Sequence, residues 1–178
     1  MNTEKLLLNM NSSLVQRSHM AQKILDDEIV LSEIITIVQN NMELSLKALM
    51  ALEVLSRDHF EKLQKYVPAL ADAGKLYVNS ASRRYLSKIY GQAIQANDKT
   101  DHNFYLTSKV KKQIIELSFF WLISNEETAV KVFSMQNLFD LRHEDIWISE
   151  ELKAIIEKQF PVSSQGFKPR ATKILRKL

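Results

Sequence analysis

The chain of 178 residues contains no cysteine. This absence excludes a disulfide framework, thiolate metal sites and a cysteine nucleophile, and it fits a reducing compartment. Glycine and proline are also scarce, with three of each, although together they make up about 12% of an average protein. Few tight turns are therefore expected. Their scarcity disfavours hairpin-rich all-β folds and leaves almost no glycine for the phosphate-binding loops of nucleotide-binding folds.

Long apolar runs are missing as well. The first residues offer only the short run 6–8, which is far from the length of a signal-peptide core. The longest dense apolar stretch, residues 114–123, contains Glu116 and Ser118 and is about half as long as a bilayer crossing requires. We therefore expect a cytoplasmic protein that does not cross a membrane.

Apolar residues nevertheless make up 46% of the chain, enough for a sizeable core, while the net charge of +3 favours no class of partner. The apolar residues recur at spacings of three and four, which predicts a succession of helices without strands. Polar breaks follow one another about every 15 to 20 residues, as in a stack of helical hairpins. The predicted breaks lie at residues 40–41, 56–58, 79–80, 95–103, 124–125, 142–145 and 162–166.

Two prolines constrain this succession. Pro68 lies inside the predicted helix 59–73 and is expected to kink or divide it, because proline removes a backbone donor and collides with the preceding turn. Pro169 is expected in the first turn of the last helix, where proline is tolerated.

An internal repeat is the most informative feature of the sequence. Four segments, beginning near residues 46, 83, 130 and 167, carry a basic residue at the same place and a mostly small residue three positions later. In a helix these two positions share one stripe, so the small residues would let a neighbouring helix approach closely. The spacing is 37, 47 and 37 residues, and the longer interval contains a polar insertion near residues 95–106. The basic positions are Lys47, Arg84, Lys131 and Lys168, and the small positions are Met50, Ser87, Ser134 and Ala171.

The segments resemble HEAT repeats, in which a first helix and a polar turn precede a second helix that opens with Val-Lys or Val-Arg. Residues 122–141 carry the resemblance most clearly, through Asn125 in the turn, the pair Val130-Lys131, the small residue Ser134, and Leu138 and Leu141. The resemblance covers roughly residues 28–178. It implies an all-α, right-handed α-α superhelix of about four HEAT-like helical hairpins, whose first helices would be residues 28–39, 59–73, 107–123 and 149–160.

This resemblance predicts one domain, residues 1–178, in which residues 1–27 cap the N-terminal end. The helix 107–123 is apolar on nearly every side over residues 114–123, so it is expected in the middle of the stack and protected from hydrogen exchange. Trp121 is expected in the core, whereas Trp147 is either a core residue or the anchor of a groove.

Helical solenoids bind extended partners, so the predicted function is that of a non-catalytic scaffold for a protein or peptide partner. No cofactor and no catalytic residue are expected. No metal site is expected either, since the four histidines, His19, His59, His102 and His143, have no second histidine at a metal-ligand spacing.

Nucleic-acid binding is the alternative function. Residues 166–178 carry five basic residues and no acid, and a second basic cluster lies near Tyr77, Tyr85 and Tyr90. Cations with interleaved aromatic rings would bind a nucleic-acid strand. A cationic cap at the helix end and helix-packed tyrosines explain the same residues. The candidate basic contact surface consists of Arg83, Arg84, Lys88, Lys168, Arg170, Lys173, Arg176 and Lys177.

The repeated basic positions also have two interpretations. They form either a ladder that binds phosphates or acidic peptide, or a seam in which each cation pairs with a turn residue such as Asp, Glu or Asn of the adjacent repeat. The second is favoured for Lys131, because it shares its helical stripe with Ser134, Met135 and Leu138.

The chain resembles the HEAT-like alkylpurine DNA glycosylases in repeat type and modest basicity, but no segment offers a catalytic aspartate with flanking tryptophans. Adenylosuccinate lyases carry a serine-rich signature loop with Met-Pro and lysine, and the nearest string, SSQGFKPR at residues 163–170, lacks the Met-Pro. The sequence therefore argues against an adenylosuccinate lyase.

Overall fold

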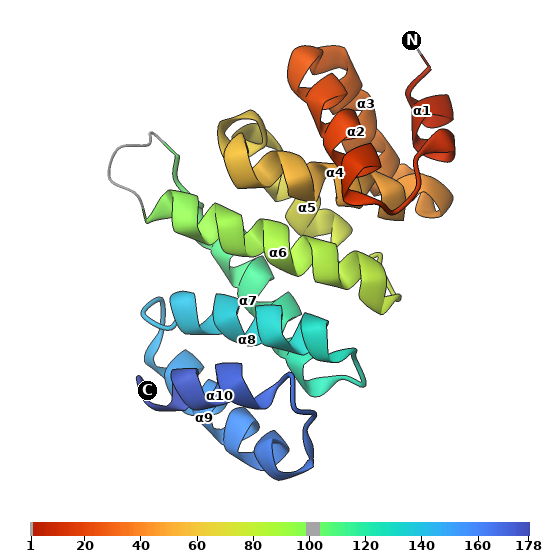
Figure 1. Ribbon diagram of the computed structural model, residues 1–178. Coiled ribbons are helices and arrows are strands. Elements are labelled where there is room, and N and C mark those ends of the chain that lie inside the picture. The colour runs from red at the N-terminus through yellow and green to blue at the C-terminus, as the bar shows by residue number, and fades with distance from the viewer. Residues whose placement is uncertain (1, 99–103) are drawn as a thin grey trace. The chain divides into compact units, whose positions relative to one another are not determined.

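The computed structural model describes residues 2–98 and 104–178 and is built of helices alone over these residues (Figure 1). It has ten α-helices, three short 3-10 helices and no strand in this part of the chain, which confirms the predicted all-α fold. Part of the predicted polar insertion, residues 99–103 with His102, lies outside the described residues. The chain divides into two compact units, Met1–Phe104 and Tyr105–Leu178, which we call the N-terminal and C-terminal units.

The N-terminal unit is organised around one long helix, α4, which packs against α1, α2, α3 and α6. Its residues Ala48, Leu49, Ala51 and Leu52 are fully buried, so both its small and its large apolar side chains contribute to the core. The elements of this unit are α1 (Thr3–Asn9), α2 (Leu14–Asp26), α3 (Glu28–Asn40), α4 (Met42–Asp58), η1 (Phe60–Lys62), η2 (Gln64–Tyr66), α5 (Val67–Ala73) and α6 (Ser80–Asn97).

Capping side chains start the helices at several of the predicted breaks. The Asn41 side-chain oxygen accepts hydrogen bonds from the amides of Glu43 and Leu44, both at 3.2 Å, and so begins α4. Asn79 caps α6 in the same way, with a bond of 2.8 Å from the Ser82 amide. The predicted break at residues 56–58 is wrong, because α4 continues to Asp58.

Pro68 marks a divided segment, as expected. The predicted helix 59–73 consists of η1, η2 and then α5, and Pro68 lies in the first turn of α5. The proline therefore starts a helix instead of kinking one, because a first-turn residue needs no backbone donor. Pro169 likewise lies in the first turn of its helix.

The C-terminal unit consists of two helical pairs. Helix α8 contacts α7, α9 and α10 and is the element that joins the pairs. Trp121 is fully buried, as predicted. The elements are α7 (Ser108–Ile123), α8 (Thr128–Asp140), α9 (Ile146–Gln159), η3 (Phe160–Val162) and α10 (Lys168–Leu175).

Helix α7 differs from the prediction in its degree of burial. Phe120 and Ile123 are 51% and 60% exposed, so the apolar stretch 114–123 is not covered on every side. A helix in a pair contacts its partner and its neighbours over part of its circumference, and the remaining side faces outward. None of the helices in the described part of the chain has the length and apolar character of a membrane crossing.

The repeat positions identified in the sequence have matching environments. The four small positions, Met50, Ser87, Ser134 and Ala171, are all buried, between 0 and 7% exposed. The four basic positions, Lys47, Arg84, Lys131 and Lys168, are all half-buried. The small positions of the predicted stripe are therefore covered by the rest of the fold in all four segments.

Hydrogen exchange tests where the C-terminal unit is most stable. We expect the amides between Ile114 and Leu122 of α7 to exchange most slowly in this unit, because these two side chains and Trp121 are fully buried. Hydrogen–deuterium exchange read by mass spectrometry measures this directly. Slower exchange in α9, which buries only Ile148, Leu152 and Ile156, would contradict the assignment of the core to α7 and α8.

Candidate functional site

The structure places the eight residues of the predicted basic surface in two groups. Three lie on α6 in the N-terminal unit, and five lie on α10 or directly after it in the C-terminal unit. We call them the α6 group and the α10 group. The α6 group is Arg83, Arg84 and Lys88, and the α10 group is Lys168, Arg170, Lys173, Arg176 and Lys177.

The α6 arginines and their tyrosines make contacts within the N-terminal unit. Arg83 donates from Nε to the Tyr77 carbonyl at 2.9 Å. Arg84 donates from Nη2 to the Tyr85 hydroxyl at 3.1 Å, and its guanidinium lies 4.9 Å from the centre of that ring. Tyr77, Tyr85 and Tyr90 are at most 5% exposed. These rings pack helices together and present no surface on which bases would stack.

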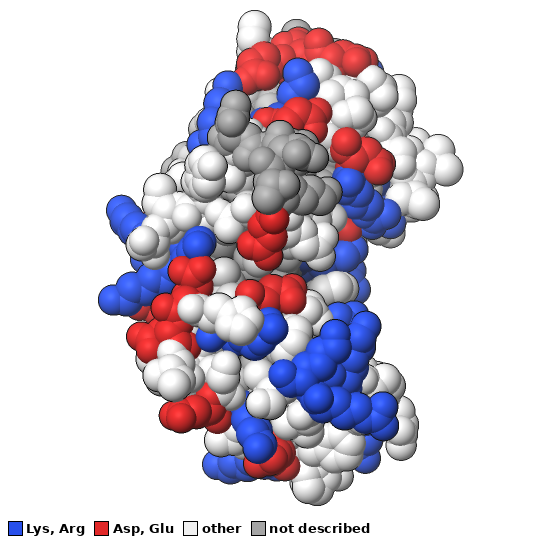
Figure 2. All heavy atoms as spheres, turned by 90° about the vertical axis from the view of Figure 1, so that its left-hand side faces the viewer, with Lys and Arg blue, Asp and Glu red and all other residues white. Residues whose placement is uncertain are grey.

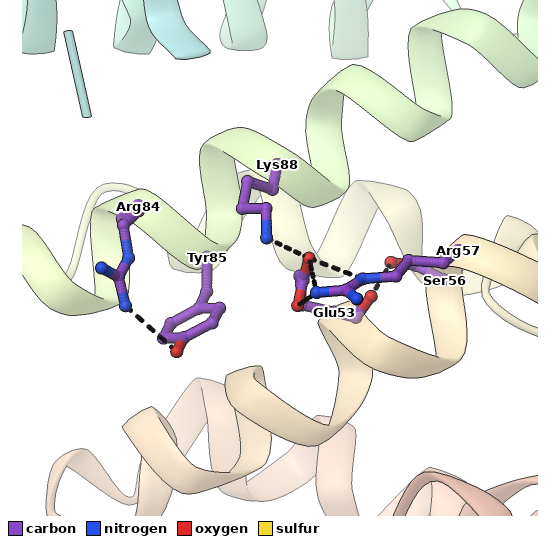
Figure 3. Close-up of polar contacts among 6 residues, drawn as sticks. All are labelled: Glu53, Ser56, Arg57, Arg84, Tyr85 and Lys88. Carbon is purple, nitrogen blue, oxygen red and sulfur yellow. Dashed lines mark hydrogen bonds and ion pairs between the residues drawn. The ribbon is translucent and has the colours of Figure 1, made fainter. Parts of the chain in front are cut away.

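Lys88 contacts a buried carboxylate on the neighbouring helix (Figure 3). Glu53 of α4 is fully buried, and its carboxylate accepts bonds from Arg57 Nε at 3.0 Å and Arg57 Nη2 at 2.8 Å. Lys88 Nζ forms an ion pair with the same carboxylate. Burial alone would raise the pKa of Glu53, but the bonds from Arg57 and Lys88 outweigh it and hold that pKa below its ordinary value. This cluster links α4 to α6.

At the repeated basic position of α8, Lys131 contacts the neighbouring pair. Lys131 Nζ donates to Gln159 Oε1 at 3.3 Å, and Gln159 Nε2 donates in turn to the Leu122 carbonyl at 2.9 Å. The acceptor is thus Gln159 at the end of α9, and not the Asp, Glu or Asn of a turn that the sequence predicted. Gln159 is held at this place by its bond to the end of α7. The three residues connect α7, α8 and α9.

The other three repeated basic positions also contact protein groups. Lys47 Nζ donates to the Leu8 carbonyl at 2.7 Å, which ties α1 to α4. Lys168 Nζ lies 5.8 Å from the centre of the Phe160 ring. With Arg84 on Tyr85, all four positions take part in contacts of the fold.

Helix α10 presents cations to solvent. Ala171 and Ile174 are buried where the helix packs against α8 and α9, so the residues opposite them point outward. We call the cations around these two positions the α10 basic face; they are Arg170, Lys173, Arg176 and Lys177. Figure 2 shows Lys and Arg side chains gathered into a patch on the C-terminal unit.

Most of the α10 basic face is available to a partner. Lys173, Arg176 and Lys177 are exposed, and none of their side chains has a hydrogen bond or an ion pair among the residues that the structure describes. Arg170 is half-buried and donates to Gln136 Oε1 of α8. The unit as a whole holds twelve Lys and Arg against nine Asp and Glu, so the chain's net positive charge resides here.

An apolar hollow, which we call the α10 cleft, adjoins this face. It has a volume of about 430 Å³ and lies between the end of α9, η3 and α10. Phe160, Pro161 and Leu175 supply its apolar lining, and Glu157, Thr172 and Arg176 complete it.

A second hollow, the α7–α9 groove, has a volume of about 680 Å³. Ile123 and Val162 border it and are 60% and 87% exposed. Trp147 stacks on Phe119 with ring centres 5.3 Å apart, one helical turn before Glu151 of the groove. Trp147 is 46% exposed, so it belongs to the surface of α9 and not to the core. Further lining comes from Glu126, Thr128, Lys131, Ala154, Ile155, Lys158, Gln159, Ser163, Ser164 and Phe167.

The apolar residues of the two hollows were not predicted as site residues. Ile123 was assigned to the core, and Val162 to a polar break. One sequence signal does exist for Ile123: residues 114–123 are apolar on nearly every side, and a helix in a pair cannot bury every side. No comparable signal marks Leu175 or Pro161, since their exposure depends on where η3 turns.

Glu53→Gln tests the buried ion cluster. The variant keeps the side-chain shape but removes the charge that Arg57 and Lys88 neutralise, so we expect the free energy of unfolding at neutral pH to fall by about 2 kcal/mol. The folded-state pKa of Glu53 is lowered, so its stabilising contribution is present above the unfolded value of about 4.3 and is lost as pH falls through the folded value. The difference between variant and wild type should therefore shrink in acid.

Urea unfolding curves at neutral and acidic pH measure both effects. Glu61→Gln is the matched control, because Glu61 is more than half exposed and pairs only with His59 at 3.4 Å among the described residues. Its change should stay below about 0.5 kcal/mol. Equal losses in the two variants, or a loss at Glu53 that does not depend on pH, would contradict the role of the cluster.

The exposed basic residues and the two hollows described above belong to the C-terminal unit. Among the described residues, no three or more His, Cys, Asp or Glu side chains are grouped so as to hold a metal ion. Comparisons of the chain with protein-family models, with curated proteins and with solved structures give no significant match. The α10 basic face, the α10 cleft and the α7–α9 groove are therefore the features on which a function is proposed.

Proposed function

We propose that the chain is a non-catalytic helical-repeat scaffold that binds a protein or peptide partner. Its repeats would be four HEAT-like hairpins, α3–α4, α5–α6, α7–α8 and α9–α10, arranged as a right-handed superhelix. Two observations support this repeat assignment. The equivalent small and basic positions have equivalent burial, and second helices of consecutive hairpins pack together within each unit, α4 on α6 and α8 on α10.

The α7–α9 groove is the observation that carries the binding function. Large apolar side chains that remain exposed around an open hollow are typical of surfaces that hold another protein. Ile123 comes from α7, Ile155 from α9 and Val162 from η3, so three elements supply apolar contacts to one hollow. Lys158 and Glu151 are exposed at the same groove, and their side chains make no hydrogen bond or ion pair within the described chain.

An amphipathic helix is the partner segment that fits this arrangement. Its apolar side chains, repeated at three and four residues, would contact Ile123, Ile155 and Val162. Its polar side would carry both signs of charge, complementary to Lys158 and Glu151 of α9. Helix-in-groove binding needs no change of the scaffold fold, so the groove serves as it stands.

Selection from a displayed library of random peptides tests this function. Peptides of about 16 residues that bind the full chain should share apolar residues at helical spacing. Ile123→Glu places a charge in the groove at an exposed position, so the selected peptides should bind this variant at least about tenfold more weakly.

Val15→Glu is the control for Ile123→Glu, because Val15 is a 77% exposed apolar residue of the N-terminal unit. The selected peptides should bind this control with wild-type affinity. Peptides that bind wild type and Ile123→Glu equally, or a selection that enriches no peptide, would contradict a scaffold that uses the α7–α9 groove.

A further inference from the structure

The charge of α10 exceeds what its own helix requires. Cations in the last turn of a helix stabilise it through the macrodipole, an effect that fades within that turn. This accounts for Lys173 and Arg176, at the end of the helix. Lys168 and Arg170 lie in the first turn, where the dipole disfavours positive charge. The chain therefore keeps cations on α10 at positions that do not stabilise the helix.

The surroundings of α10 do not neutralise these cations. After Glu157 the sequence contains no Asp or Glu, and the α10 group has no ion pair in the described chain. Glu157 lines the α10 cleft, where Arg176 also lies. Like charges on one short helix repel one another, so a negatively charged partner would lower the free energy of this arrangement.

The α10 cleft indicates a second property of the partner, in addition to negative charge. Its apolar lining of Phe160, Pro161 and Leu175 would remain wet unless an apolar group entered it. A nucleic-acid strand would bring phosphates to the cations, but its bases need an open aromatic face for stacking. Phe160 is the only aromatic residue among the residues described at this cleft, and the Lys168 ammonium lies over its ring. The cleft fits an aliphatic or aromatic side chain of a peptide better than a base.

We propose that the α10 basic face and the α10 cleft form a docking site for an acidic peptide segment whose apolar side chain enters the cleft. This inference rests on the proposed scaffold function and assigns the chemistry of a partner at a surface separate from the α7–α9 groove. Carboxylates of the segment contact Lys173, Arg176 and Lys177. Its apolar side chain packs against Leu175 and Pro161, which line the cleft together with Glu157.

Fluorescence anisotropy with labelled synthetic peptides tests the proposal on the full chain. The probe is a peptide of about 16 residues with Leu at helical spacing and Glu elsewhere. One matched peptide carries Lys in place of Glu, and another carries Ser in place of Leu. The Glu/Leu peptide should bind, the Lys/Leu peptide should not, and the Glu/Ser peptide should bind at least about tenfold more weakly than Glu/Leu.

Three variants assign the binding to this surface. The double change Lys173→Glu with Lys177→Glu should weaken binding of the Glu/Leu peptide at least about tenfold. Thr172→Glu introduces a charge at the cleft and should also weaken it. Glu157→Gln removes the single acid of the cleft and should strengthen it by about twofold.

The matched control is Lys109→Glu with Lys112→Glu, which makes the same change of charge at two exposed positions of α7. It should leave the affinity within about twofold of wild type. Circular dichroism melting confirms that each variant is folded before binding is measured.

Several results would overturn the proposal. Equal binding of the Glu/Leu and Glu/Ser peptides would show that the cleft takes no part. Equal loss in the α7 control and the α10 double variant would show attraction to net charge alone. Tighter binding of labelled oligothymidine, abolished by the α10 double variant, would assign the surface to nucleic acid. None of these results changes how the library peptides bind to wild type and to Ile123→Glu. A failure of this proposal is therefore distinguishable from a failure of the scaffold function.

Discussion

Packing of α4 on α6 in the N-terminal unit, and of α8 on α7 and α10 in the C-terminal unit, is the constraint on which the fold of each unit depends. A helical pair buries the surface between its own two helices and leaves the outer sides to be covered by other elements. Two small side chains on these helices, Ser87 on α6 and Ser134 on α8, are fully buried. Small residues bring helix axes close together, so exchange for larger residues would separate the helices. Ala171 on α10 continues the same stripe at the last helix.

Charged residues have two roles in this structure. Some join neighbouring helices, and others lie exposed at the end of a helix. Glu53 on α4 is fully buried and is neutralised by Arg57 of its own helix and Lys88 of α6. Removing one member of such a cluster costs more than the cluster contributes, because an uncompensated charge is left behind. On α10, by contrast, Lys173 and Lys177 face solvent. Basic residues thus link helices in the N-terminal unit and lie open to a partner in the C-terminal unit.

Much of the fold could be predicted from sequence because it depends on local signals. Asn41 and Asn79 mark helix starts through capping that operates within four residues, and Pro68 marks a division through sterics of the same range. The burial of Ser134 and the half-burial of Lys131 follow from their helical spacing. The predicted end of α4 was wrong, since Ser56 and Asp58 resemble a polar break although the helix continues to Asp58.

The candidate site was only partly predictable, because it depends on how separate elements meet. The cations of α10 were visible as a cluster in the sequence, and their outward direction follows from the burial of Ala171 and Ile174. The sequence did not show that the basic residues divide into two groups. Lys88 forms an ion pair with Glu53, a partner 35 positions away in the chain, and is therefore not free to bind a partner. The α10 cleft has Pro161 of η3 and Leu175 of α10 in its lining, and no spacing rule indicates that these two residues border one hollow.

In the proposed complex, the C-terminal unit holds a partner segment through α10 and the cleft beside it. An NMR titration of the isotope-labelled full chain with the Glu/Leu peptide tests this location, since amide shifts report the contact residue by residue. Saturable shifts are expected at residues 157–162 and 168–178, with the N-terminal unit unchanged. Shifts spread evenly over the chain, or concentrated on α6 around Arg83 and Arg84, would contradict it.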